Sequence, residues 1–208
     1  MRAEPVLLLA TRNAGKLMEL NGILAGFGVN AIDLDAAGIG RRGEEDGLEC
    51  FDSLRANALA KARYFHRLSD MPTLADDSGL SVDALDGQPG VHSRRYSGRD
   101  DLSGRELDDA NNRKLIGELR ATLHPAARFE CAAAYVDADL EMVEECSAEG
   151  EMVRAPRGEN GFGYDPYFLS SDLGKTFAEA TMEEKAPVSH RGRAFGALVV
   201  KLRERGRI

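Results

Sequence analysis

PVLLLATRNAGKL, residues 5–17, joins a short apolar run to a polar loop and the start of a helix. Residues 5–10 have the length and composition of a buried strand. Apolar side chains then recur at the spacing of one helix face, at Leu17, Leu20, Leu24 and Phe27. A strand, a loop and a helix in this order predict the first unit of an α/β fold.

The loop in this stretch nearly matches a phosphate-binding P-loop, which reads Gly, four residues, Gly-Lys and then Ser or Thr. Gly15 and Lys16 fit, but Ala10 replaces the first glycine and Leu17 replaces the hydroxyl residue that holds magnesium. Backbone N–H groups at a helix start bind phosphates. The loop therefore predicts either a phosphate site whose metal is held by other residues, or a plain strand–helix connection with a surface lysine.

The composition excludes several classes of protein. The 208 residues include 27 basic and 35 acidic side chains, a formal net charge of −8, which argues against a nucleic-acid-binding surface. Three cysteines, none in a CxxC pair, do not predict a zinc site and suit a reducing compartment. The apolar run near the N-terminus is too short for a signal or a membrane span. We expect a cytoplasmic protein that binds neither nucleic acid nor membrane.

The rest of the chain continues the mixed pattern. After a polar loop at residues 38–49, one helix face is predicted from Phe51, Leu54, Ala58, Ala62 and Phe65. A strand over residues 73–76 is expected to end at DDSGL, where Ser78-Gly79 would form a turn. Further expected elements are a helix at 105–121, a hairpin of 128–136 with a strand from Leu140, a glycine loop at 158–166 and a helix from about Ser189. The pattern predicts one α/β domain over residues 1–208.

Two groups of carboxylates are candidates for chemistry. Asp76 and Asp77 are adjacent on a predicted strand, so their side chains point to opposite sides and one can face a cleft; the alternative is a solvated acidic turn. Glu44, Glu45 and Asp46 lie in the 38–49 loop, where charges are ordinarily solvated. Together the groups could hold a hard divalent cation, with Glu44 or Glu45 beside Asp77.

Two later segments suggest ligand contacts. In GENGFGYDP, residues 158–166, Phe162 could stack on a nucleobase, or Phe162 and Tyr164 could enter the core. His190 and Arg191 fall in the first turn of the last helix, where positive charge is unfavourable against the helix dipole. They suit an anionic or carbonyl-bearing ligand, or are surface charge.

These motifs occur in one order: TRNAGK (11–16), EEDGL (44–48), NALAKAR (57–63), ADDSGL (75–80), PGVHSRRYSG (89–98), GFGYDP (161–166) and EEKAPVSHRGRA (183–194). From residue 6 to about residue 200 the chain resembles the inosine triphosphate pyrophosphatase family, which clears non-canonical purine nucleotides. The resemblance implies magnesium-dependent hydrolysis of ITP, dITP and XTP to the monophosphate and pyrophosphate, with manganese as a possible substitute. It also implies a homodimer, and a long mixed β-sheet flanked by helices, with two lobes around a central substrate cleft.

The resemblance also assigns residue roles. Asp77 resembles the general base that meets the metal, with Lys16 as a second catalytic residue and Glu44 or Glu45 as the other metal carboxylate. The implied substrate contacts are Thr11, Arg12, Asn13, Ala14, Gly15, Lys16, Lys61 and Ser78, and, around the base, Phe162, Gly163, Tyr164, Asp165, Lys185, His190 and Arg191.

The sequence departs from the family pattern at two positions. Arg12 stands where a small residue is usual, so it either adds charge at the phosphates or points outward, and Ala56 precedes Asn57 where the family has Glu. Two other functions are alternatives for this sequence. A Nudix pyrophosphatase lacks support because RELDDANN (105–112) has no Glu-Glu pair. A non-catalytic nucleotide sensor would need the lysines and Phe162 but no paired carboxylates, which repel phosphates unless a metal intervenes.

Overall fold

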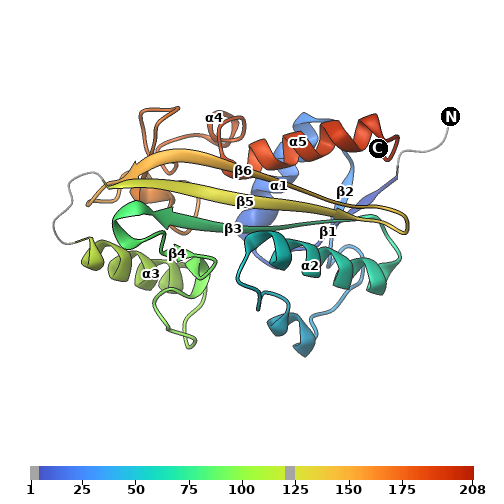
Figure 1. Cartoon of the computed structure of the whole chain (residues 1–208), viewed down its shortest axis with the longest axis horizontal. Coiled ribbons are helices and arrows are strands. Elements are labelled where there is room, and N and C mark those ends of the chain that lie inside the picture. Colours follow the sequence, from blue (N-terminus) through green and yellow to red (C-terminus); the bar gives the residue numbers. More distant parts are fainter. Residues whose placement is uncertain (1–4, 120–124) are drawn as a thin grey trace. The chain divides into compact units, whose positions relative to one another are not determined.

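The computed structural model describes residues 5–119 and 125–208, which form a mixed β-sheet with α-helices (Figure 1). The strands of the sheet are β1 (Leu7–Leu9), β2 (Ala31–Asp33), β3 (Thr73–Val82), β4 (Pro89–Gly90), β5 (Ala126–Val136), β6 (Glu141–Met152) and β7 (Phe168–Ser170). Its order is β2-β1-β3-β5-β6-β7, with β4 on β3. Parallel pairing joins β1 to β2 and β3, whereas β4 on β3 and β7 on β6 are antiparallel. The predicted long mixed sheet is confirmed.

The α-helices of the described residues are α1 (Ala14–Gly26), α2 (Leu54–Ser69), α3 (Gly104–Glu118), α4 (Met182–Lys185) and α5 (His190–Glu204). Short 3₁₀ helices form at Gly43–Gly47, Asp83–Leu85, Ser93–Arg95 and Asp165–Tyr167. Among these described residues, no helix has the length and apolar content that crossing a membrane requires.

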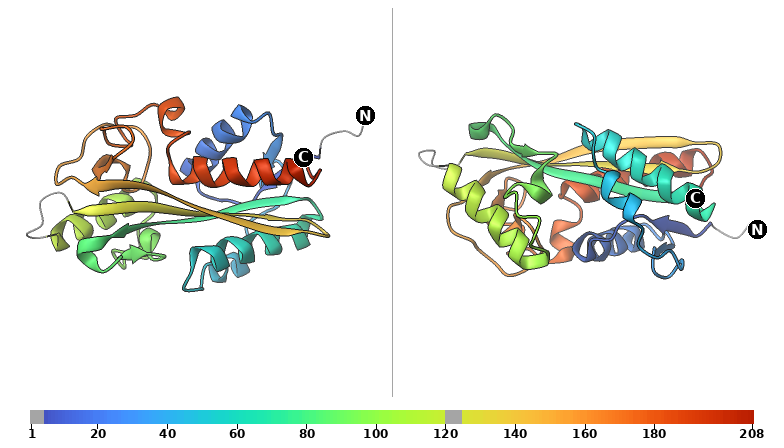
Figure 2. Two further views of the ribbon diagram at one scale, coloured as in Figure 1. Left: turned by 45° about the horizontal axis from the view of Figure 1, so that its top comes forward. Right: turned by 90° about the horizontal axis from the view of Figure 1, so that it is seen from below.

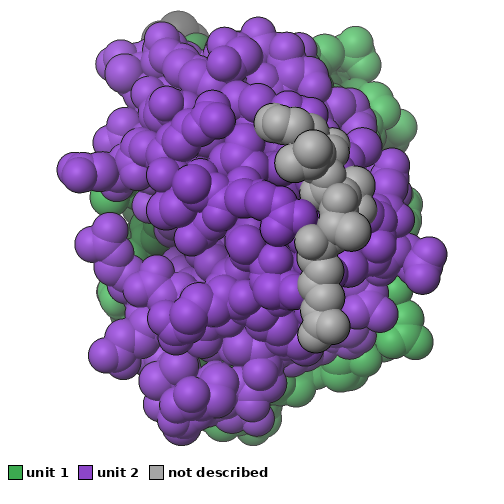
Figure 3. All heavy atoms as spheres, turned by 90° about the vertical axis from the view of Figure 1, so that its left-hand side faces the viewer, with its two compact units in different colours: residues 1–77, 131–146, 191–208 green, residues 78–130, 147–190 purple. Residues whose placement is uncertain are grey.

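The chain divides into two compact units (Figure 3). Unit 1 comprises residues up to 77 with 131–146 and 191–208, and unit 2 comprises 78–130 and 147–190. The long strands β3, β5 and β6 each contribute residues to both units. The prediction of one domain over residues 1–208 stays a prediction.

In unit 1, α2 covers one face of the strands, and α1 and α5 cover the other (Figures 1 and 2). The three leucines of β1 are fully buried because both faces are covered, which explains why this strand is a continuous apolar run. On the α2 side, Ala62 and Phe65 pack with Leu8 of β1 and small residues of β3 and β5.

In unit 2, α3 covers one face of β3 and β5, and the segments around β7 and α4 lie on the other (Figure 2). The core here is aromatic. The rings of Phe129 and Phe168 lie 4.7 Å apart, and those of Phe168 and Phe177 lie 4.9 Å apart. Met152 at the end of β6 and Phe168 at the start of β7 belong to this core, and the loop at residues 158–166 lies between them in the sequence.

The hairpin between β5 and β6 and the two helices at the ends of the chain agree with the predictions. The hairpin turns at Asp137, whose N–H donates to the Leu140 carbonyl at 2.9 Å, and α5 begins directly after Ser189. Phe51 precedes α2 and is 47% exposed, so its predicted place on the helix face is wrong. The predicted 38–49 loop contains a 3₁₀ helix, and α4 was not predicted. Residues 120–121 of the predicted 105–121 helix lie outside the described residues.

The predicted turn at Ser78-Gly79 is wrong, because β3 continues through both residues to Val82. Gly79 is needed there for space: a Cβ atom on it would lie 2.3 Å from the carbonyl oxygen of Gly90, on the neighbouring strand β4. Glycine inside a strand often marks such a close backbone approach. The residue type therefore reflects strand packing, and the strand carries Asp76 and Asp77 at its centre.

We predict that Gly79→Ala lowers the free energy of unfolding by about 1–3 kcal/mol, the usual cost of overpacking. For a chain of this size the melting temperature should fall by about 2–4 °C per kcal/mol. Gly117→Ala is the control, because a Cβ there meets nothing within 4 Å and lies in α3, where alanine stabilises by up to about 1 kcal/mol. Equal melting temperatures for the two variants would contradict the close approach at Gly79.

Candidate active site

Unit 1 contains a cluster of buried charges around β3. Asp76 and Asp77 are 0% and 6% exposed, and as strand neighbours they point to opposite faces. The Asp76 carboxylate lies 3.1 Å from Lys16 Nζ and 3.2 Å from Arg191 Nε. The Asp77 carboxylate accepts a hydrogen bond from Asn57 Nδ2 of α2 at 3.0 Å.

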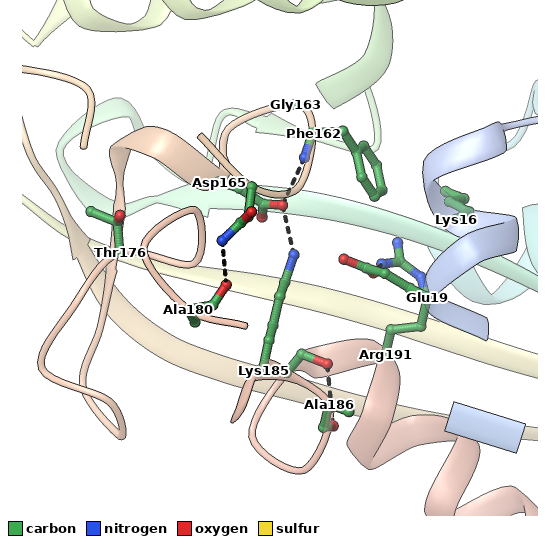
Figure 4. A network of polar contacts seen from close by, with 12 residues as sticks. Lys16, Glu19, Phe162, Gly163, Asp165, Thr176, Ala180, Lys185, Ala186 and Arg191 are labelled. Atoms are coloured by element: carbon green, nitrogen blue, oxygen red, sulfur yellow. Dashed lines mark hydrogen bonds and ion pairs between the residues drawn. The ribbon is translucent and has the colours of Figure 1, made fainter. Parts of the chain in front are cut away.

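The loop before α1 places Lys16 in this cluster. The Asn13 side chain caps the helix by accepting from the Lys16 N–H at 3.0 Å, and Thr11 Oγ1 accepts from the Asn13 N–H at 3.2 Å. The helix therefore begins at Ala14, and its first turn presents Lys16 to Asp76. Figure 4 shows Lys16 and Glu19 on α1, with Glu19 directed at Arg191, to which it forms an ion pair.

The two aspartates have opposite electrostatic environments. Burial opposes ionisation of Asp76, but Lys16, Arg191 and Lys61 together hold its pKa well below the usual range. Burial raises the pKa of Asp77 above its ordinary value, against the opposing effect of Lys16 and Lys61. Asp76 is thus a permanent anion that positions cations, whereas Asp77 accepts a proton more readily than an ordinary aspartate.

Lys61 connects this cluster to a carboxylate that the sequence analysis missed. Its Nζ donates to the backbone carbonyl of Asp76 at 2.8 Å and forms an ion pair with Glu49. Burial alone would raise the pKa of Glu49, but Lys61 and Lys16 hold it below its ordinary value. Asn57 also holds this segment, because its side chain bonds both the N–H and the carbonyl of Phe51. The sequence offered one indication of this pairing: Glu49 lies a few residues before α2, the helix that carries Asn57 and Lys61.

Glu44 and Glu45 have other partners. The Arg12 guanidinium donates to both oxygens of Glu45, at 3.1 and 3.0 Å, and the hydroxyl of Tyr64 donates to Glu44 at 2.9 Å. Arg12 also contacts Asp35 at 3.2 Å, so it ties residues 35–45 to the loop before α1. Its side chain is one-quarter exposed and does not simply point outward. The assignment of Glu44 or Glu45 to the metal stays a prediction.

In unit 2, the predicted base-binding residues form a network of their own (Figure 4). Asp165 accepts from the Phe162 N–H at 2.9 Å and from Lys185 Nζ at 2.6 Å. Lys185 Nζ also lies 5.8 Å from the centre of the half-buried Phe162 ring. Tyr164 is 5% exposed and its hydroxyl donates to the Ser93 carbonyl at 2.8 Å, so its side chain belongs to the core.

The remaining predicted contacts lie on β3 and α5. Ser78 is half-buried on β3. The imidazole of His190 stacks on Phe129 at 4.7 Å and 11° within unit 2. Arg191, 2% exposed, extends to Asp76 and Glu19 within unit 1. The role of Arg191 in base selection stays a prediction, and its observed contacts make it the partner of Asp76.

A family model described as the Ham1 family matches residues 7–201. The chain belongs to the Ham1 family. It is 44% identical over 200 residues to the dITP/XTP pyrophosphatase of Ralstonia nicotianae, covering 95% of this chain and 96% of the relative. It is 45% identical to the dITP/XTP pyrophosphatase of Syntrophobacter fumaroxidans, covering 91% and 78%. The resemblance found in the sequence is confirmed.

Solved structures agree with this assignment. A HAM1 protein from Coxiella burnetii matches with a TM-score of 0.79 at 32% identity, over 96% of this chain and 99% of that one. The nucleoside-triphosphatase, or dITP/XTP pyrophosphatase, of Mycobacterium abscessus matches with a TM-score of 0.67 at 40% identity, over 92% and 96%. The predicted α/β fold is therefore the fold of the Ham1 family.

The charge cluster of this Ham1 protein has a donor set that fits magnesium. Within the described residues, no group of three or more His, Cys, Asp or Glu side chains could by itself hold a metal ion. Magnesium, however, commonly uses one or two carboxylates and completes its shell with water and substrate phosphates. Asp77 and Glu49, which interact electrostatically in one cluster, supply two such carboxylates.

Opposite pKa shifts predict opposite effects on stability for the two aspartates. Because the folded pKa of Asp76 is lowered, its charge stabilises the fold at any pH above its unfolded pKa of about 3.9, and this stability is lost as the pH falls. At pH 7, Asp76→Asn should lower the free energy of unfolding by about 3–5 kcal/mol, the cost of breaking a buried ion pair. Asp77→Asn removes a charge that folding disfavours, so stability should stay level or rise.

Urea unfolding at pH 7, with a chelator and no nucleotide, measures both variants. The two substitutions make the same chemical change at neighbouring positions, so each is the control for the other. An Asp77→Asn protein as unstable as Asp76→Asn would contradict the assignment of the permanent charge to Asp76.

Proposed function

We propose that this Ham1 protein hydrolyses non-canonical purine nucleoside triphosphates, ITP, dITP and XTP, to the monophosphate and pyrophosphate. The observation that carries the proposal is the buried carboxylate of Asp77, which lies in one charge cluster with Lys16 and Lys61. A carboxylate side chain held at the reacting group can act as a general base that takes a proton from water. The relatives named dITP/XTP pyrophosphatases support this choice of substrate.

In the proposed reaction, a water molecule attacks the α-phosphorus while Asp77 takes its proton. The bond from the α-phosphorus to the bridging oxygen breaks, and pyrophosphate leaves with the electron pair. Lys16 and Lys61 neutralise charge that develops on the phosphates, a form of electrostatic stabilisation. Asp76 holds both lysines, one by its carboxylate and the other by its backbone carbonyl.

We propose that a magnesium ion, or manganese in its place, is held by Asp77 together with Glu49. When bound, such an ion polarises phosphate oxygens and lowers the pKa of water. Glu49 is preferred because its partner Lys61 also lies beside Asp77. The contacts of Glu45 and Glu44 are instead with Arg12 and Tyr64. A cytoplasmic homodimer that binds no nucleic acid is also part of the proposal.

Base recognition is proposed for the unit 2 network. The half-buried Phe162 ring offers a stacking surface, and Lys185 offers a cationic donor beside it. ITP and XTP carry a carbonyl at purine C6, where ATP carries an amino group. A hydrogen-bond donor of the protein can donate to the C6 carbonyl of ITP or XTP, but it would face another donor in the amino group of ATP. Sites built on such a hydrogen bond discriminate strongly between the two kinds of nucleotide.

The activity is tested by pyrophosphate release from ITP, XTP, dITP and ATP, with and without magnesium. We expect release from the first three, little from ATP, and none after chelation. Asp77→Asn should lower kcat for ITP by at least about a hundredfold, the lower range for general-base catalysis. Asp46→Asn is the control, because Asp46 is exposed and forms an ion pair with Arg41, away from the lysine cluster. Near-normal turnover in Asp77→Asn would refute its role as base.

A second comparison identifies the metal carboxylate. We expect Glu49→Gln to raise the magnesium concentration for half-maximal activity by at least about tenfold, since even outer-shell partners of metals contribute this much. Glu45→Gln is the matched control, because Glu45 lies in the same segment before α2, and it should leave that concentration within about twofold. If instead Glu45→Gln raised that concentration and Glu49→Gln did not, the ion would be assigned to Glu45, and Glu49 would have only its structural ion pair with Lys61.

A further inference from the structure

The loop that carries Phe162 is built on unusual backbone. Gly158, Gly161 and Gly163 have φ values of 80°, 73° and 62°, a region that glycine enters without strain. Glycine-rich backbone has many accessible conformations, so this sequence alone does not fix the place of Phe162. Other groups must hold the loop if the aromatic ring is to meet a ligand in one orientation.

Two side chains of α3 hold the residue that follows Phe162. Asp108 Oδ2 accepts from the Gly163 N–H at 2.9 Å, and Asn112 Nδ2 donates to the Gly163 carbonyl at 2.9 Å. The two residues are four apart and therefore lie on one face of the helix. Both polar backbone groups of one glycine are thus bound from a single rigid element.

The N-terminal side of Phe162 is held as well. The Phe162 N–H donates to Asp165, and a Cβ on Gly161 would lie 2.1 Å from the Asp165 carboxylate, so Gly161 allows that carboxylate to approach. Phe162 is therefore held on both sides: its own N–H is bound by Asp165, and the next residue, Gly163, is bound by α3.

α3 is itself anchored to the segment around Ser93–Arg95. Asn111 accepts from the Ser97 N–H at 2.8 Å and donates to the Arg94 carbonyl at 2.9 Å, and Lys114 donates to the Tyr96 carbonyl at 2.8 Å. Asn112 is 5% exposed, and its Oδ1 atom has no hydrogen-bond partner among the described residues.

We propose that Asp108 and Asn112 are positioning residues for purine recognition: they fix Gly163 so that Phe162 is held ready for stacking. The inference rests on the proposed function and deepens it. A preorganised loop loses less conformational freedom when a base binds, so the pair contributes to affinity for the base. They do not touch the reacting phosphates and leave the chemical step unchanged.

Two inhibitors that each carry one part of the substrate distinguish this positioning role from a general structural role. IMP carries the base without a triphosphate, and pyrophosphate carries phosphates without a base. We expect Asp108→Ala and Asn112→Ala to raise KM for ITP and the inhibition constant of IMP by about tenfold each. The value of kcat and the inhibition constant of pyrophosphate should stay within about threefold. Asp108→Asn, whose amide oxygen can still accept from Gly163, should recover most of the loss.

Asp109→Ala is the matched control, because Asp109 is the exposed neighbour of Asp108 on the same helix. It should leave all four constants unchanged. Amide hydrogen exchange gives a readout that is independent of activity: the Gly163 N–H should exchange faster in Asp108→Ala than in Asp109→Ala.

Unchanged IMP inhibition in both alanine variants would overturn the inference, and so would equal losses for IMP and pyrophosphate, which indicate a structural role. If the wild-type protein releases no pyrophosphate from any nucleotide, the proposed function fails instead. Calorimetric titration of IMP into wild-type and Asp108→Ala protein then decides the positioning role: a roughly tenfold difference in Kd supports it, and equal Kd values overturn it.

Discussion

Unit 1 depends on the ion pairs that the buried carboxylate of Asp76 forms with Lys16 and Arg191. A fully buried anion is tolerated only when cations and hydrogen bonds compensate it. Lys16 from α1 and Arg191 from α5 both reach this carboxylate, and Lys61 from α2 reaches the backbone carbonyl of the same residue. Three helices are therefore tied to the centre of β3 at one point, and the lysines proposed to meet the triphosphate are fixed by the same contacts.

The same arrangement gives two neighbouring aspartates different electrostatic environments. Asp76 has its charge fully matched, while Asp77, on the opposite face, has its pKa raised by burial. The strand makes this possible, since successive residues face different surroundings. A structural anion thus orients the cations, and the carboxylate that we propose as the general base stands beside it.

Periodicity in the sequence was enough to find β1, α1, the β5–β6 hairpin and α5, because these elements bury regular apolar patterns. It failed at Gly79, where a glycine that makes room for the Gly90 carbonyl looks the same as one that makes a turn. The candidate site residues were predicted from the order of the motifs, and their roles stay predictions. Glu49 was missed because its pairing with Lys61 depends on how the chain folds back before α2, which local spacing does not reveal. The contacts of Arg12 with Glu45, 33 residues away, were equally invisible.

The division of the chain into interleaved segments has an evolutionary consequence. The polypeptide passes between the two units at residues 77–78, 130–131, 146–147 and 190–191, so neither unit is a continuous stretch of sequence. A single recombination event cannot transfer unit 1 or unit 2 intact to another gene, in contrast to domains joined end to end by linkers. The two halves must be inherited together, and a substitution in one is always selected in the presence of the other.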